Sequence, residues 1–94
     1  SSSSSNSSSS IDEYTAYDFG TSYANQTYEF YDVYNGKNRY IGTTDSQLFI
    51  QWSGSQWHLT ELGTTLYRNN DTTTLPPLTQ WTHVDGLTPG GYLI

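Results

Sequence analysis

The chain has 94 residues, few enough for one domain, and it contains no cysteine, which excludes a disulfide framework and a thiolate site. Three basic residues against nine acidic ones give a net charge of −6. That balance argues against nucleic-acid binding, which depends on neutralising phosphates with Lys and Arg. No apolar run approaches the roughly 20 residues of a transmembrane helix, so we expect no membrane span. Methionine is also missing, and we expect Ser1 to be a processed or excerpted start.

The composition favours an all-β protein. Charged residues make up 13% of the chain, about half the usual share, and aromatic residues make up 16%. Thr, Tyr, Trp, Phe, Val and Ile fit a pleated, half-buried surface. An acidic chain without cysteine that is rich in Ser, Thr, Tyr, Asn and Gly is typical of cell-surface or appendage proteins. We therefore expect an extracellular location, or one on a cell or virion surface.

Residues 1–10 are nine serines and Asn6. Such a run is usually a linker, because serine side chains bury little area. A neighbouring subunit, an added strand ladder or attached sugar would give it a partner, and we expect an assembly contact. The chain is accordingly divided into an extended Ser-rich N-terminal segment, 1–19, and a single β domain, 20–94.

Strands are predicted in chain order from the alternation of apolar residues and from turn residues. A weak strand over 14–19 ends at Gly20, and a strong one covers 26–34. Asn35-Gly36 is a type I′ hairpin signal that pairs Asp32 with Arg39, Tyr31 with Tyr40 and Phe30 with Ile41.

A second hairpin is predicted from 47–52 and 57–62, with Trp52 and Trp57 on one face. Shorter strands follow at 65–68 and 81–84, and 92–94 is an apolar end. Pro76-Pro77 breaks any ladder, so 72–78 is expected to cross an edge or a corner. The fold class that results is a small antiparallel β-sandwich or barrel.

The expected core is small for about 84 residues without disulfides. It consists of Phe30, Ile41, Leu48, Ile50, Trp52, Trp57, Leu59, Leu62, Leu66, Trp81, Val84 and Leu87. Strand 26–34 carries aromatic side chains on both faces, and a second semi-apolar face has to meet solvent, sugar or another subunit.

The sequence predicts no enzyme, no cofactor and no metal site. His58 and His83 are the two imidazoles, and neither belongs to a cluster with the spacing of zinc ligands. Ser53-Gly54-Ser55 does not match a nucleophile elbow, and the acids do not form a calcium loop. A calcium ion, or a glycosidase pair of carboxylates brought together by folding, is an alternative.

The sequence suggests two kinds of association with sugar, covalent glycosylation and non-covalent glycan binding. Asn6, Asn25 and Asn70 each begin an Asn-x-Ser/Thr acceptor, and we expect covalent glycan on them or on the serine run. Bound glycan is the alternative, because aromatic side chains offer flat, amphipathic faces. The candidates for stacking are Trp52, Trp57, Tyr23 and Tyr31, although Trp52 and Trp57 are more often a core pair across two strands.

The chain resembles small aromatic-rich β modules of uncharacterised surface, virion or appendage proteins of microbes and phages. The motifs that carry this resemblance are, in order, YNG, WSGSQW, LYRN, PPLTQW and DGLTP, and they cover roughly residues 24 to 90. The resemblance implies an extracellular building or binding module and no known activity. In type, the chain is also similar to subunits of glycosylated extracellular fibrils.

Two functions follow as hypotheses. The first is a structural subunit of a glycosylated extracellular fibre or appendage that assembles with copies of itself. Its N-terminal segment would add as a strand to a neighbour, with Ile11, Tyr14, Tyr17 and Phe19 filling pockets. The second is a carbohydrate-binding or host-attachment module of a cell-surface or virion protein.

Overall fold

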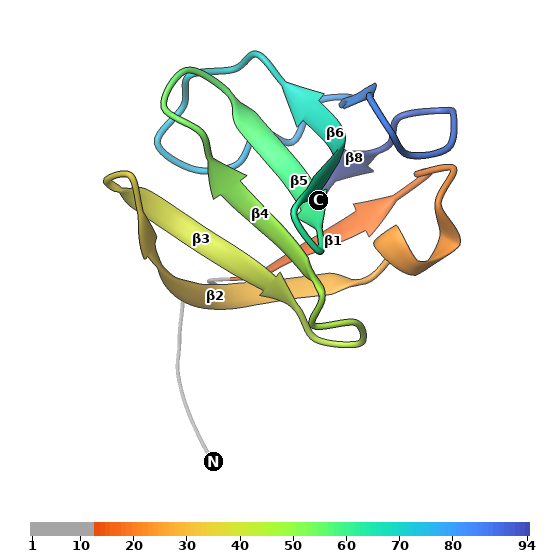
Figure 1. Ribbon diagram of the computed structural model, residues 1–94, viewed down its shortest axis with the longest axis horizontal. Helices are drawn as coiled ribbons and strands as arrows, with labels where there is room; N and C mark the ends of the chain where they lie inside the picture. Colours follow the sequence, from red (N-terminus) through yellow and green to blue (C-terminus); the bar gives the residue numbers. More distant parts are fainter. Residues whose placement is uncertain (1–12) are drawn as a thin grey trace.

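The computed structural model describes residues 13–94, in which eight strands form one antiparallel sheet that curls into an incomplete barrel (Figure 1). The strand order is β7-β6-β5-β4-β3-β2-β1-β8, so each strand up to β7 pairs with the next one along the chain. The predicted all-β antiparallel class is confirmed. The strands are β1 (Glu13–Tyr17), β2 (Thr27–Tyr34), β3 (Lys37–Gly42), β4 (Leu48–Trp52), β5 (Trp57–Glu61), β6 (Thr64–Asn69), β7 (Thr82–His83) and β8 (Tyr92–Leu93), and a short 3-10 turn, η2 (Ser22–Ala24), lies between β1 and β2.

The turn at Asn35-Gly36 sets the β2–β3 hairpin as the sequence predicts. Both residues have positive φ, 55° and 83°, which a type I′ turn requires. Asp32 therefore lies opposite Arg39. The two side chains form a salt bridge with Nε to Oδ1 at 2.8 Å, so this predicted pair is confirmed.

Farther from the turn the predicted register is wrong by one residue. A β-bulge lies between Phe30 and Asp32, and Tyr31 is the extra residue. Phe30 consequently lies opposite Tyr40 and not Ile41. A bulge adds local bend and twist to a strand, so β2 is expected to bend at this position.

The second hairpin is paired as predicted, with Trp52 opposite Trp57. Its second strand turns directly into β6 through Leu62-Gly63, whose φ values are 53° and 86°. This is a second tight two-residue turn, and the sequence did not indicate it because Leu rarely adopts positive φ. Three adjacent hairpins thus make the centre of the sheet.

The two ends of the sheet are joined by hydrogen bonds, although β7 and β8 are short. The Trp81 N–H donates to the Gly91 carbonyl at 2.7 Å, and Gln80 Nε2 donates to the Gly90 carbonyl at 3.0 Å. A Cβ on Gly90 would lie 1.7 Å from the Trp81 carbonyl oxygen, so this approach needs glycine. The joined ends give the sheet an enclosed inner face.

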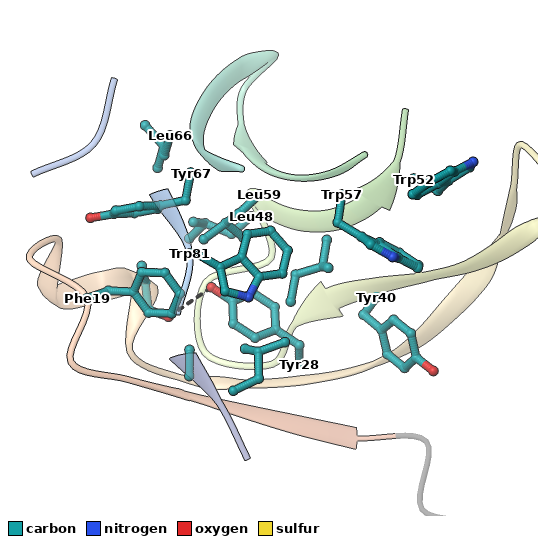
Figure 2. Close-up of a cluster of buried hydrophobic side chains, with 14 residues drawn as sticks. Phe19, Tyr28, Tyr40, Leu48, Trp52, Trp57, Leu59, Leu66, Tyr67 and Trp81 are labelled. Carbon is teal, nitrogen blue, oxygen red and sulfur yellow. Dashed lines mark hydrogen bonds between the residues drawn. The ribbon is translucent and has the colours of Figure 1, made fainter. Parts of the chain in front are cut away.

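The core fills that inner face and consists mainly of aromatic residues (Figure 2). Trp81 lies in the middle of the cluster, Trp52 lies at one end, and Tyr67 and Leu66 lie at the other. The Trp57 and Trp81 indole N–H groups donate to the carbonyls of Thr73 and Pro77. These two bonds hold the long 70–81 segment against the barrel.

The predicted core was right in its centre and wrong at its margins. The structure buries seven of the twelve expected residues: Leu48, Ile50, Trp52, Trp57, Leu59, Leu66 and Trp81. Phe30, Leu62, Val84 and Leu87 are exposed, and Ile41 is half-buried. Leu62 lies at the tip of a turn, and Val84 and Leu87 lie in the connection between β7 and β8. Their places are taken by Ala16, Phe19, Ala24, Tyr28, Tyr40, Tyr67 and Leu93.

Tyr67 is fully buried, and its hydroxyl joins three parts of the chain. It donates to the Leu87 carbonyl at 2.6 Å and accepts the Thr21 N–H at 3.1 Å. Thr21 Oγ1, 2.9 Å away, donates to the same oxygen and accepts the Leu87 N–H at 3.1 Å. Because the carbonyl can only accept, this is the assignment that satisfies every donor and acceptor of the network.

Residues 13–19, which the sequence placed in the N-terminal segment, belong to the domain. β1 lies between β2 and β8, and Phe19 is buried with its ring 4.6 Å from that of Tyr67. The serine run lies outside the described residues. Among residues 13–94, no helix is long and apolar enough to cross a membrane.

Candidate functional site

A continuous row of polar side chains crosses the outer face of the sheet from β2 to β6. Asp32 lies opposite Arg39, Gln51 opposite His58, and His58 opposite Arg68. The pairing of Tyr40 with Ile50 continues to the adjacent position and places Arg39 beside Gln51. We call Asp32, Arg39, Gln51, His58 and Arg68 the outer row.

The outer row exists because side chains alternate between the two faces of a strand. Its residues are half-buried or exposed, whereas their chain neighbours Tyr40, Ile50, Leu59 and Tyr67 are buried on the inner face. The same register therefore makes the core and the outer row.

At one end of the outer row, Gln56 links Arg68 to His58 through hydrogen bonds. Arg68 Nη1 donates to Gln56 Oε1 at 3.4 Å, and Gln56 Nε2 lies 2.9 Å from His58 Nε2. Since Gln56 Nε2 can only donate, His58 Nε2 accepts, and the imidazole is neutral with its proton on Nδ1. Desolvation, and secondly the charge of Arg68, lower the pKa of His58 below its usual 6.5.

The other end is an arginine held among aromatic rings. Arg39 Nε and Nη2 each donate to one carboxylate oxygen of Asp32 at 2.8 Å. The guanidinium carbon lies 5.1 Å from the ring centroids of Tyr31, Tyr34 and Phe49. A bidentate pair with three cation–π contacts fixes the guanidinium plane. We call Tyr31, Tyr34 and Phe49 the aromatic cluster.

This arrangement offers both kinds of hydrogen-bonding group beside accessible ring surface. Asp32 accepts, Arg39 and Arg68 donate, and Gln51 does both, while His58, whose Nε2 already accepts from Gln56, can donate through its Nδ1–H. In the aromatic cluster, Tyr31 is 50% exposed and Tyr34 is 40% exposed. The face is suited to a ligand that has many hydroxyl groups and weakly polar C–H surfaces.

The four residues proposed for glycan stacking do not lie together. Tyr31 belongs to the aromatic cluster, and Tyr23 lies in a separate cleft beside Glu61, to which its hydroxyl donates at 2.9 Å. Trp52 and Trp57 are buried in edge contact with each other, with centroids 5.6 Å apart. Their inclusion was wrong, and the alternative of a core pair is what the structure has.

The candidate glycosylation sites differ in the hydrogen bonding and exposure of their side-chain amides. Asn6 lies outside the described residues. Asn25 Nδ2 donates to the Phe19 carbonyl at 2.8 Å, and its Oδ1 accepts the Phe19 N–H at 2.9 Å, so this amide holds a loop. Asn70 is exposed in the segment after β6, which makes it the better placed acceptor of the two.

The residues proposed for assembly are used mostly within the chain. Ile11 lies outside the described residues. Tyr14 is half-buried with its ring 5.0 Å from that of Tyr40, and Phe19 is in the core. Tyr17 is 46% exposed, and its ring lies 6.4 Å from that of Tyr92.

Sequence reasoning missed the outer row as a unit. The Asn35-Gly36 turn and the pairing of Trp52 with Trp57 predict its first four residues, but joining them requires the β3–β4 register, which no tight turn sets. Within residues 13–94, no group of three or more His, Asp or Glu side chains is placed to hold a metal ion. No family model, curated protein or solved structure matches the chain, so the resemblance to small aromatic-rich β modules stays a prediction.

We predict that His58 titrates below pH 6.5 and that Arg68→Gln raises its pKa by removing a neighbouring positive charge. Because the unfolded chain takes up this proton first, His58 makes folding less favourable as the pH falls below 6.5. An NMR titration of the imidazole signals, assigned with His58→Gln, measures the pKa. A value at or above 6.5 would contradict the desolvated, neutral imidazole.

Proposed function

We propose that the chain is a carbohydrate-binding module of an extracellular surface and that the outer row and the aromatic cluster bind the ligand. The observation that carries the proposal is the continuous row of alternating donors and acceptors beside exposed tyrosine rings. Sugar hydroxyls both donate and accept, and the C–H faces of sugar rings pack on aromatic rings. A ligand of this kind pairs with every group of the row.

The charge of the row supports a neutral ligand. Arg39 is neutralised by Asp32, and His58 is uncharged near neutral pH, so Arg68 supplies the remaining positive charge. The whole chain carries −6, which repels acidic polymers. Hydrogen bonding and stacking, and not charge, are therefore the proposed source of affinity.

The length of the row supports a chain of sugars in place of a single one. Neighbouring strands lie about 4.8 Å apart, so the four spacings from β2 to β6 extend over roughly 19 Å. A single sugar ring would contact one or two positions of such a row. We infer that the ligand is an oligosaccharide or polysaccharide that runs across the strands.

The direct test compares two exposed tyrosines, of which one lies in the site. Once a glycan array has identified a ligand, Tyr31→Ala is expected to weaken binding by about tenfold, because an aromatic stacking contact contributes ~0.5–1.5 kcal/mol beyond area burial. Tyr17→Ala is the control, since Tyr17 has a similar exposure and lies outside the row. Isothermal titration calorimetry measures both.

Equal affinities for Tyr31→Ala and Tyr17→Ala would place the ligand elsewhere. An array without any bound glycan, with the folded chain verified by NMR, would contradict the proposed function itself.

We retain self-assembly into an extracellular fibre as a separate proposal, supported by an apolar edge. Tyr17, Tyr92 and Ile94 are 46%, 37% and 60% exposed around β1 and the two-residue end strand β8. The strand donor of this proposal is now residues 1–12, because β1 and Phe19 are used within the domain.

Deleting residues 1–12 leaves every described strand in place, whereas a deletion to residue 19 would also remove β1. The proposal predicts that the full chain forms filaments and that the shorter chain stays monomeric in light scattering. Filaments from both chains would exclude the N-terminal segment as donor, and a monomeric full chain would exclude the fibre.

A further inference from the structure

A cleft of about 380 Å³ lies apart from the outer row, where η2, the β5–β6 turn and the 85–87 loop meet. This volume is within the range of small-ligand sites, about 300–1,000 Å³. Its polar lining includes Tyr23, Glu61 and Asp85, and its apolar lining includes Leu62 and Leu87. We call it the side cleft.

The walls of the side cleft are held by the Tyr67 network. Thr21 and Leu87 are each hydrogen-bonded to the Tyr67 hydroxyl, and the Leu87 N–H also donates to Thr21 Oγ1. Gly86 packs on the Tyr67 ring, where a Cβ would lie 2.8 Å from ring carbons. Preformed walls reduce the ordering cost of binding.

The side cleft has negative charge without a cation of its own. Within residues 13–94 the one salt bridge joins Arg39 to Asp32, so neither Glu61 nor Asp85 is paired with a basic side chain there. Glu61 accepts the Tyr23 hydroxyl, and the pKa of Tyr23 is raised, first by this bond and then by desolvation. The two carboxylates of the cleft and the Tyr23 ring therefore favour a positively charged group.

The apolar part of the side cleft is unusually exposed. Leu62 is 75% exposed and Leu87 is 65% exposed, which are the two largest exposed fractions among the large hydrophobic residues described. Leu62 also has a positive φ of 53°, a conformation in which leucine is disfavoured. Neither side chain is buried by the chain itself, and an apolar stem in the cleft would cover both.

We propose that the side cleft binds an alkylammonium group, with the ammonium at Glu61 and Asp85 and the alkyl stem on Leu62 and Leu87. Lysine side chains and free primary amines share this chemistry. A sugar is a poorer fit, because it lacks the positive charge and would leave the leucines in contact with hydroxyls. The proposal is independent of carbohydrate binding at the outer row.

The test is an NMR titration of the full chain with pentylammonium, pentan-1-ol and pentanoate at constant ionic strength. We expect saturable shifts of the 62–64 and 85–87 amides with pentylammonium, about fivefold weaker binding of the alcohol, and none of the carboxylate. Nα-acetyl-lysine methylamide then shows whether a lysine in a peptide context binds as well as the free amine.

Matched variants locate the charge. Glu61→Gln and Asp85→Asn each remove one negative charge, and Glu61→Gln keeps an oxygen that accepts the Tyr23 hydroxyl. Each is expected to weaken pentylammonium binding by about fivefold, whereas Glu29→Gln, an exposed acid of β2, is expected to leave it unchanged. If Glu61→Gln does not fold, the loss of pentylammonium affinity in Asp85→Asn is by itself the test of the charge contribution.

Equal binding of the alcohol and the ammonium would reduce the side cleft to an apolar site and overturn the proposal. Shifts outside the cleft, or a loss with Glu29→Gln as large as with Asp85→Asn, would overturn it as well. Loss of binding with Asp85→Asn but not with Tyr31→Ala separates this site from the outer row.

Discussion

The Tyr67 hydroxyl is the constraint on which the rest of this small barrel depends. Tyr67 lies within β6, and its hydroxyl bonds to Thr21 and Leu87, which are 46 and 20 residues away along the chain. Removing a partner from a buried polar group costs about 1–3 kcal/mol, a large fraction of the stability of a domain this size. The network thus joins the β1–β2 connection and the β7–β8 connection to β6.

The outer row and the side cleft both follow from the way the sheet curls and its connections pack. Curling of the sheet puts Tyr40, Ile50, Leu59 and Tyr67 inside, and strand alternation then puts Arg39, Gln51, His58 and Arg68 outside. The Asp85 and Gly86 N–H groups donate to the Thr65 and Leu66 carbonyls, which places the 85–87 loop beside the β5–β6 turn, and the cleft lies between them. One surface presents hydrogen-bonding groups and rings, and the other presents carboxylates and leucines.

Local signals in the sequence were enough for the two predicted hairpins and not for the way they combine. Asn35-Gly36 and the four residues after Trp52 determine pairings at short range, and both pairings are confirmed. The bulge at Tyr31 and the turn at Leu62-Gly63 have no such signal. Their unfavourable local conformations are stabilised by packing and pairing with the rest of the sheet, and not by the residues of the turn or bulge themselves.

Three of the seven core residues that the sequence missed are tyrosines, Tyr28, Tyr40 and Tyr67. Tyr28 and Tyr67 were absent from the predicted core, and the hydroxyl of each donates to a loop carbonyl, that of Ala24 and that of Leu87. Those partners lie in loops, and loop positions depend on contacts between distant residues. Of the site, the pair of Asp32 and Arg39 and the exposure of Tyr23 and Tyr31 were predictable from the sequence, whereas the outer row required the whole sheet.

Amide hydrogen exchange of the intact chain tests the role of Tyr67 most directly. The Thr21 N–H bonds to the Tyr67 hydroxyl and the Leu87 N–H bonds to Thr21, so both should exchange as slowly as the Leu59 amide in the central strand β5. Tyr67→Phe should accelerate the Thr21 and Leu87 amides selectively. If these amides exchange in the unaltered chain as fast as that of exposed Ser55, the Tyr67 network does not hold the barrel together.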